Sequence, residues 1–162
     1  MAHLVLLNPE IPNNTGNIGR TAAATGSRLH VIHPIGFDMS EKARRRAGLD
    51  YWDAVDCREH ADWPAFLATE SPPRLWLYTT KSDRPHWDAD FQRGDYLLFG
   101  KETAGVPDHV HEWVGATQGA DRRLTLPMIP DPRARSLNLS TVVCAAVYEL
   151  MRQVRIGVSD AT

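Results

Sequence analysis

A set of short, almost continuous apolar runs limits the possible folds of this sequence more than any other feature. The runs lie at residues 4–7, 29–32, 75–78 and 96–99. Runs of about four residues are too short for helices, and continuous hydrophobicity is typical of strands buried on both faces. Such strands occur in parallel sheets that helices cover. The runs therefore predict an α/β domain built on a parallel sheet.

The segments between the runs carry the signals of helices. The first helix is expected to begin near Asn14 or Thr15 and to end at Gly26, because glycine commonly follows a helix. In the second, Ser40 is the expected N-cap and Gly48 the stop. The expected helices of this part of the chain cover residues 14–26, 40–47 and 62–69.

The last helix has the clearest pattern, with apolar residues at the spacing of one helix face from Leu139 to Val154. Cys144, Ala145 and Tyr148 add apolar surface on another side. We expect burial on two sides, by the sheet and by a partner subunit. One wide apolar face is the alternative.

Length and composition fit one globular domain over residues 1–162. No apolar stretch approaches the roughly 18–20 residues of a membrane span, and the N-terminus lacks the features of a signal peptide. The two cysteines, Cys57 and Cys144, lie far apart and predict reduced thiols in a cytoplasmic protein. The net charge of −2 excludes a uniformly basic nucleic-acid coat but allows a local basic patch.

Ligands of α/β folds bind at the carboxyl ends of the strands, so the loops after the runs are candidate sites. The loop at residues 8–20 leads into a helix N-terminus, which suits an anion, and Arg20 could hold a phosphate. In the loop at residues 100–107, Gly100 allows a ligand close to the backbone, and Glu102 could bind an amine or hydroxyl. Helix capping and ordinary turns are the alternative explanation for both loops.

A third loop, at residues 124–140, ends in a Ser-x-Asn-x-Ser sequence formed by Ser136, Asn138 and Ser140. Helix capping explains one of these polar residues but not all three, which modestly favours a binding role.

Basic residues gather beside these loops despite the overall negative charge. A solvated face is the usual explanation of such a run, and a phosphate-rich partner is the alternative that its position favours. The cluster consists of Lys42, Arg44, Arg45 and Arg46, with Arg133 and Arg135 in the third loop.

Two other chemistries are excluded and a third is weakened. His109 and His111 are two residues apart, which does not fit a helical zinc site, and no Gly-x-Ser-x-Gly elbow occurs. Gly16 and Gly19, with Asp38 about 20 residues on, partly match a dinucleotide fingerprint, but its first glycine is missing.

Three motifs in order resemble the SPOUT class of RNA methyltransferases, in its SpoU-like branch. They are residues 8–20 (NPEIPNNTGNIGR), residues 99–107 (FGKETAGVP) and residues 126–140, with LPM and then RSLNLS. The RRAGLDY segment at residues 45–51 also matches, and the resemblance covers residues 3–155. It is closest to the smallest bacterial members, which methylate the wobble nucleotide of tRNA.

The resemblance implies a C-terminal trefoil knot with the cofactor site at about residues 75–155, a homodimer, and S-adenosylmethionine (SAM) as cofactor. The implied reaction is 2′-O-methylation of nucleotide 34, a cytidine or modified uridine, in tRNA anticodon loops, with no metal and no membrane. Residues matching the branch's active site are Arg20, Asn14, Glu102, Ser136 and Asn138. Residues matching cofactor positions or their neighbours are Tyr78, Thr79, Gly100, Glu102, Leu126, Met128, Ser136 and Leu137.

The role of Arg20 is open at this point. The resemblance implies a base, whereas a guanidinium stays protonated in proteins. A cationic Arg20 would instead polarise the hydroxyl or position a phosphate. Other functions that stay open are another RNA target, a nicotinamide-dinucleotide-binding protein, and a non-catalytic RNA-binding protein.

Overall fold

The computed structural model describes residues 1–129, 131, 133 and 136–154. It has a six-stranded sheet in the order β3-β2-β1-β5-β4-β6, in which every strand pair is parallel. The strands are β1 (His3–Leu7), β2 (Arg28–Ile32), β3 (Cys57–His60), β4 (Leu75–Tyr78), β5 (Tyr96–Phe99) and β6 (Arg123–Leu124). The predicted parallel α/β fold is therefore confirmed.

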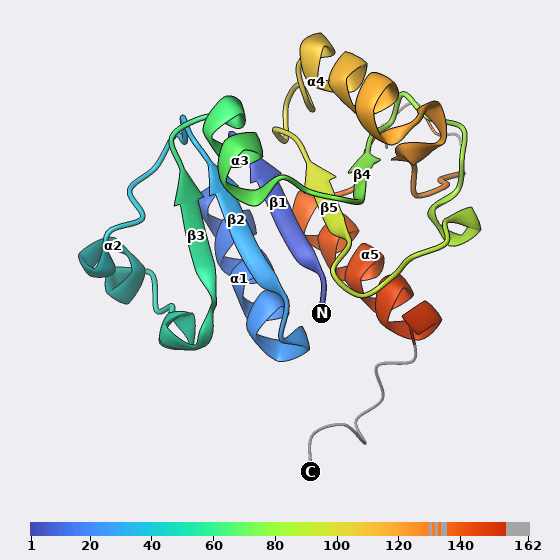
Figure 1. Cartoon of the computed structure of the whole chain (residues 1–162). Coiled ribbons are helices and arrows are strands. Elements are labelled where there is room, and N and C mark those ends of the chain that lie inside the picture. Colours follow the sequence, from blue (N-terminus) through green and yellow to red (C-terminus); the bar gives the residue numbers. More distant parts are fainter. Residues whose placement is uncertain (130, 132, 134–135, 155–162) are drawn as a thin grey trace.

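Helices cover both faces of the sheet (Figure 1), and each face has its own apolar cluster. Helices α1 and α5 pack on one face, while α3 and α4 pack on the other. The α-helices are α1 (Pro12–Thr25), α2 (Glu41–Arg46), α3 (Trp63–Glu70), α4 (Asp108–Trp113) and α5 (Leu139–Val154). Short turns of other helix types are η1 (Trp52–Ala54), η2 (His86–Asp88), η3 (Val114–Gln118) and η4 (Ala120–Arg122).

Most of the expected elements form, with local differences. Helix α1 begins at Pro12 rather than Asn14, because proline fits the first position of a helix, and Gly26 ends it in the left-handed conformation at φ 62°. Ser40 caps α2 as expected, through a hydrogen bond that its side chain accepts from the Ala43 amide. Cys57 and Cys144 are both free, as predicted.

Three elements escaped the sequence analysis for identifiable reasons. Strand β3 reads Cys-Arg-Glu-His, an edge strand with no apolar run. Strand β6 has two residues, and α4 is short and mostly polar. In the part of the chain that the structure describes, no helix is long and apolar enough to cross a membrane.

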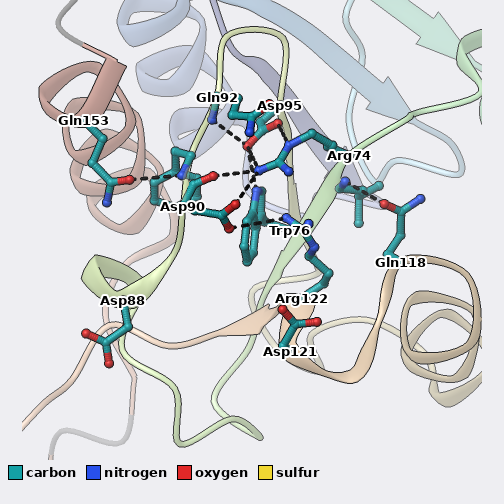
Figure 2. Close-up of polar contacts among 12 residues, drawn as sticks. Arg74, Trp76, Asp88, Asp90, Gln92, Asp95, Gln118, Asp121, Arg122 and Gln153 are labelled. Carbon is teal, nitrogen blue, oxygen red and sulfur yellow. Dashed lines mark hydrogen bonds and ion pairs between the residues drawn. The ribbon is translucent and has the colours of Figure 1, made fainter.

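A buried carboxylate fastens the segment before β5 to strand β4 (Figure 2). The side chain of Asp95 is 1% exposed and accepts hydrogen bonds from Arg74 Nε at 2.7 Å and Trp76 Nε1 at 2.7 Å. Its Oδ2 also accepts a bond from the Gln92 amide at 2.9 Å. Arg122 lies over the Trp76 ring, 4.0 Å from its centroid. Because a buried charge is stable only when it is fully paired, this network fixes β4 and β5 side by side.

Three histidines form a hydrogen-bonded row across neighbouring strands, on the face that α3 covers. His3 Nδ1 lies 2.9 Å from His30 Nε2, and His30 Nδ1 lies 3.0 Å from His60 Nε2. Glu70 Oε1 is 3.9 Å from His30 Nδ1 and accepts a bond from Arg58 at 3.1 Å. His3, His30 and Glu70 are close enough to hold a metal ion, but hydrogen bonds within the protein already occupy these groups.

Burial keeps this row neutral. It lowers the pKa of His30 to about 3 and also lowers the pKa values of His3 and His60. The carboxylate of Glu70 opposes the shift at all three positions. The unfolded chain takes up protons on these histidines below about pH 6.5, whereas the folded chain does not until the pH approaches the lowered values.

We therefore expect the free energy of unfolding to fall as the pH drops from about 6.5 toward 3. The expected slope is about 1.4 kcal/mol per pH unit for each histidine that stays neutral in the folded protein. Urea unfolding at a series of pH values measures it. His30→Phe should lower the stability at pH 7.5 and flatten the acid slope. The matched control is His109→Gln, at an exposed position of α4. Identical slopes for His30→Phe and wild type would contradict this assignment.

Candidate functional site

A cleft of about 780 Å³ opens at the carboxyl ends of β4 and β5, and we call it the strand-end cleft. Parallel sheets place ligands at this edge. The volume lies within the roughly 300–1,000 Å³ range of pockets that enclose small molecules. Its lining includes every residue that the sequence analysis assigned to a cofactor: Tyr78, Thr79, Gly100, Glu102, Leu126, Met128, Ser136 and Leu137.

Glu102 joins the loop after β5 to the loop after β1. Its Oε2 accepts a hydrogen bond from the Glu10 amide at 2.9 Å. Its Oε1 accepts bonds from the Ile11 amide at 3.2 Å and from Asn14 Nδ2 at 3.0 Å. The carboxylate thus binds N–H groups at the start of α1, where the helix dipole also favours negative charge. Glu102 is therefore held toward the neighbouring loop.

Asn14 also forms a hydrogen bond with the third loop. Its Oδ1 accepts a hydrogen bond from Asn138 Nδ2 at 2.9 Å. Asn138 Oδ1 in turn accepts bonds from Ser140 N at 2.9 Å and Ser140 Oγ at 2.7 Å. Asn138 is thus the N-cap of α5 and a contact between loops at once. Capping accounts for Asn138, while Ser136 is exposed and lines the strand-end cleft.

A second link lies beside the first. The Glu10 carboxylate accepts bonds from Thr103 Oγ1 at 2.7 Å and from the Thr103 amide at 3.3 Å. The bond from the Thr103 side chain holds the pKa of Glu10 below its usual value. Glu102 therefore accepts bonds from the loop after β1, and Glu10 accepts bonds from the loop after β5, so each loop holds the other.

Gly100 is required by a close approach of the chain to itself. A Cβ at this position would lie 2.2 Å from the Gly105 carbonyl carbon and 2.4 Å from the Val106 nitrogen. Reciprocal backbone bonds between Lys101 and Gly105, at 3.1 and 2.9 Å, close this tight loop. Because the obstructing atoms are backbone, a side chain at residue 100 would force the loop open.

Arg20 does not line the strand-end cleft, although Asn14, Glu102 and Asn138 do. It is exposed, and its guanidinium lies over the Tyr51 ring, 4.4 Å from the centroid. Arg20 is the sixth residue after Asn14, which places it about 9 Å along the axis and on another side of α1. The structure thus brings four of the five residues that match the active site together in one chain, namely Asn14, Glu102, Ser136 and Asn138.

The predicted basic patch is divided among different environments. Arg44 is half-buried and donates to the Met39 carbonyl at 2.9 Å. Arg45 and Arg46 are exposed, and Arg45 pairs with Glu41 one helical turn away. Arg133 pairs with Asp131 at 2.7 Å. Arg135 lies outside the described residues.

Sequence reasoning missed Lys81 and His111, which also line the strand-end cleft. Lys81 follows β4, so it could have been predicted from the rule that ligands of α/β folds bind at the carboxyl ends of strands. His111 comes from α4, which was not predicted. Burial, followed by the charge of Lys81, lowers the pKa of His111.

The glycines of the partial dinucleotide fingerprint lie inside α1 rather than in a phosphate-binding loop. A Cβ on Gly16 would lie 3.1 Å from Leu49, and one on Gly19 would lie 2.5 Å from the Trp52 ring. Gly16 and Gly19 allow the segment that carries Leu49 and Trp52 to pack closely against α1. Asp38 accepts a bond from the Ser40 amide at 2.7 Å and so shapes the start of α2. Neither glycine is placed as a dinucleotide site needs.

We expect Glu102→Gln to loosen the contact between the first two loops. A glutamine offers one acceptor oxygen and turns an N–H₂ group toward a donor. A lost charge-assisted bond is worth about 1.5–3 kcal/mol, so amide exchange at Glu10 and Ile11 should accelerate about 10- to 100-fold. Hydrogen exchange followed by NMR measures this.

The matched control is Glu112→Gln, an exposed glutamate of α4 that does not line the strand-end cleft. Unchanged protection of Glu10 and Ile11 in Glu102→Gln would show that the carboxylate does not hold the loop.

Comparison with known proteins agrees with this geometry. Residues 1–148 match the model of the SpoU rRNA Methylase family. The tRNA (cytidine(34)-2′-O)-methyltransferase of Escherichia coli K12 is 47% identical over 153 residues, which cover 94% of each chain.

Two solved structures have the same fold. One, described as giving insights into the 2-OH methylation of C/U34 on tRNA, has a TM-score of 0.80 and 46% identity, and the match covers 94% of this chain and 95% of the other. The second is a SpoU methyltransferase of Streptomyces viridochromogenes in complex with AdoMet, with a TM-score of 0.70 and 26% identity. That match covers 94% of this chain and 60% of the other. With the family model matching almost the whole chain, this protein belongs to the SpoU methylase family.

Proposed function

We propose that the protein transfers a methyl group from SAM to the ribose 2′-hydroxyl of wobble nucleotide 34 in tRNA. The observation that carries the proposal is the strand-end cleft, whose lining contains residues from each of the three family motifs. The identity of 47% to a relative named for this reaction supports the choice of substrate.

The cleft suits SAM in shape and chemistry. Gly100 and Gly105 line the cleft without side chains, and Leu126 and Leu137 supply apolar contact. Glu102 contributes negative charge on one wall, which suits a sulfonium cation. When bound, SAM supplies a methyl group on a sulfonium sulfur, the electrophile for a ribose hydroxyl.

The chain's own residues position the reaction. Glu102, Asn14 and Asn138 hold three loops at fixed separations, so that a hydroxyl can be aligned without reorganisation. Arg20 is exposed, and its guanidinium can hold a phosphate or polarise the attacking hydroxyl. The hydroxyl proton then leaves to RNA phosphate or water.

We propose the same finer architecture that the resemblance implies: one domain over residues 1–162, knotted at about residues 75–155. Contacts between the chain around β6 and the loop after β4 support it. Ser82 Oγ donates to the Arg123 carbonyl at 2.8 Å, and the Thr125 amide donates to the Arg84 carbonyl at 2.8 Å.

A homodimer completes the proposal. Helix α5 buries one side against the sheet, yet Tyr148 on its other side is 54% exposed, and Leu137 just before it is 43% exposed. Ile11, at the start of α1, is 44% exposed. Apolar side chains of this kind on packed helices favour a second copy of the chain as their cover.

The function is tested by radiolabelled methyl transfer from SAM to unmodified tRNA, with the methyl group mapped to its nucleotide. We expect label on the ribose of nucleotide 34. Arg20→Ala should lower kcat/KM at least a hundredfold while SAM affinity stays within twofold, because Arg20 lies outside the strand-end cleft. Arg28→Ala is the control, because Arg28 forms a surface ion pair with Asp56 at the start of β2 and does not line the strand-end cleft. Near-normal transfer by Arg20→Ala would remove Arg20 from the mechanism.

The basic patch makes a separate prediction. The double variant Arg45→Glu/Arg46→Glu should weaken tRNA binding and reduce the slope of log K against log salt by up to about 2, because each lost phosphate contact contributes about 1. Fluorescence anisotropy at several salt concentrations measures both. Ala68→Glu/Thr69→Glu, on the exposed side of α3, adds negative charge elsewhere and should bind normally. An unchanged slope in the arginine variant would place the RNA on another surface.

A further inference from the structure

A second cleft, of about 590 Å³, lies between α1 and the segment that holds α2 and η1, and we call it the α1–α2 cleft. None of the predicted cofactor residues lines it. It shares the first turn of α1 with the strand-end cleft: Ile11 and Asn14 line the strand-end cleft, while Pro12 and Asn13 line this one. A ligand that spans this turn can therefore occupy both clefts.

The walls of the α1–α2 cleft are fixed in place. Tyr51 donates its hydroxyl hydrogen to the Gly16 carbonyl at 2.7 Å. Trp52 is buried and packs where Gly19 leaves no room for a side chain. Arg44 is held by the Met39 carbonyl and lies 5.6 Å from the centroid of the Trp52 ring. The aromatic and guanidinium planes are thus set before any ligand arrives.

The exposed groups in this cleft offer stacking and hydrogen bonding together. Arg20 presents a guanidinium plane 4.4 Å above the Tyr51 ring. Asn13 and Asn17 stand one helical turn apart on the exposed side of α1. Within the described residues, neither side-chain amide has a hydrogen-bond partner.

We propose that the α1–α2 cleft binds the unpaired base of the nucleoside that is methylated. This inference rests on the proposed function, since it names where that substrate's base lies. Unpaired RNA bases stack on aromatic rings and on arginine planes, and asparagine amides bind their edges. A phosphate alone would leave the aromatic walls unused, and an apolar ligand would leave the side-chain amides of Asn13 and Asn17 without hydrogen-bond partners. With the base here, its ribose lies at the shared first turn of α1, beside the strand-end cleft.

The test uses an anticodon stem-loop RNA and its abasic version, which keeps the ribose and phosphate of nucleotide 34 but lacks the base. Binding is measured by fluorescence anisotropy. Stacking on one aromatic residue is worth about 1–3 kcal/mol, so the wild type should bind the intact RNA at least about fivefold more tightly. Tyr51→Ala should lose that preference, and Tyr51→Phe, which keeps the ring, should retain it.

Asn17→Ala gives a second test that does not depend on the Tyr51→Ala variant folding correctly. Asn17 is exposed, so its substitution should leave the fold intact. It should reduce the preference for the intact RNA. Trp87→Ala, at an exposed aromatic residue of η2 outside both clefts, should keep the preference. Tyr51→Ala should bind SAM within twofold of wild type, as measured by calorimetry.

The proposal is overturned if the wild type does not bind the RNA or does not distinguish the two RNAs. It is also overturned if Tyr51→Ala weakens both equally, or if only an abasic neighbour of nucleotide 34 is discriminated. These results are separable from the proposed function. Base discrimination without methyl transfer would refute the function alone, while transfer to nucleotide 34 without discrimination would refute the base cleft alone.

Discussion

The arrangement of the site depends on one carboxylate that accepts hydrogen bonds from its neighbouring loop. Glu102 follows β5. It binds groups that follow β1, namely the amides of Glu10 and Ile11 and the side chain of Asn14. These two strands are paired at the centre of the sheet, so the loops leave the sheet side by side. The bond from Asn138 to Asn14 then adds α5. A carboxylate with several N–H donors is a strong acceptor, and it makes three separate loops behave as one wall.

The three loops keep their positions only if the sheet that carries them is rigid, and two buried hydrogen-bond networks make it so. Asp95 binds Arg74, Trp76 and the Gln92 amide (Figure 2), which fixes β4 against β5 at their amino ends, opposite the carboxyl ends where the strand-end cleft opens. At the other edge, the row of neutral histidines joins β1, β2 and β3. Both networks are polar and buried, and such networks stabilise a fold only when their geometry is specific.

The sequence predicted the sheet better than it predicted the site. Four apolar runs identify β1, β2, β4 and β5, because burial on both faces requires continuous hydrophobicity. Strand β3 could not be found this way, since an edge strand with Arg58 and Glu59 exposed has no such run. Motif residues located the strand-end cleft, but only helix geometry shows that Arg20 faces the other one. The pairing of Arg133 with Asp131 likewise depends on loop conformation, which local sequence does not specify.

The first turn of α1 connects the chemistry of the two clefts. Successive helical residues point about 100° apart, so Asn13 and Asn14 line opposite clefts although they are adjacent in sequence. Pro12 sets where the helix begins and therefore which asparagine faces which cleft. Asn14 is committed to Glu102 and Asn138, while Asn13 is exposed. A shift of the helix by one residue along the chain would turn both asparagines by about 100°, and Asn14 would then no longer point toward Glu102. The position of the proline therefore matters for the site although its ring carries no reactive group.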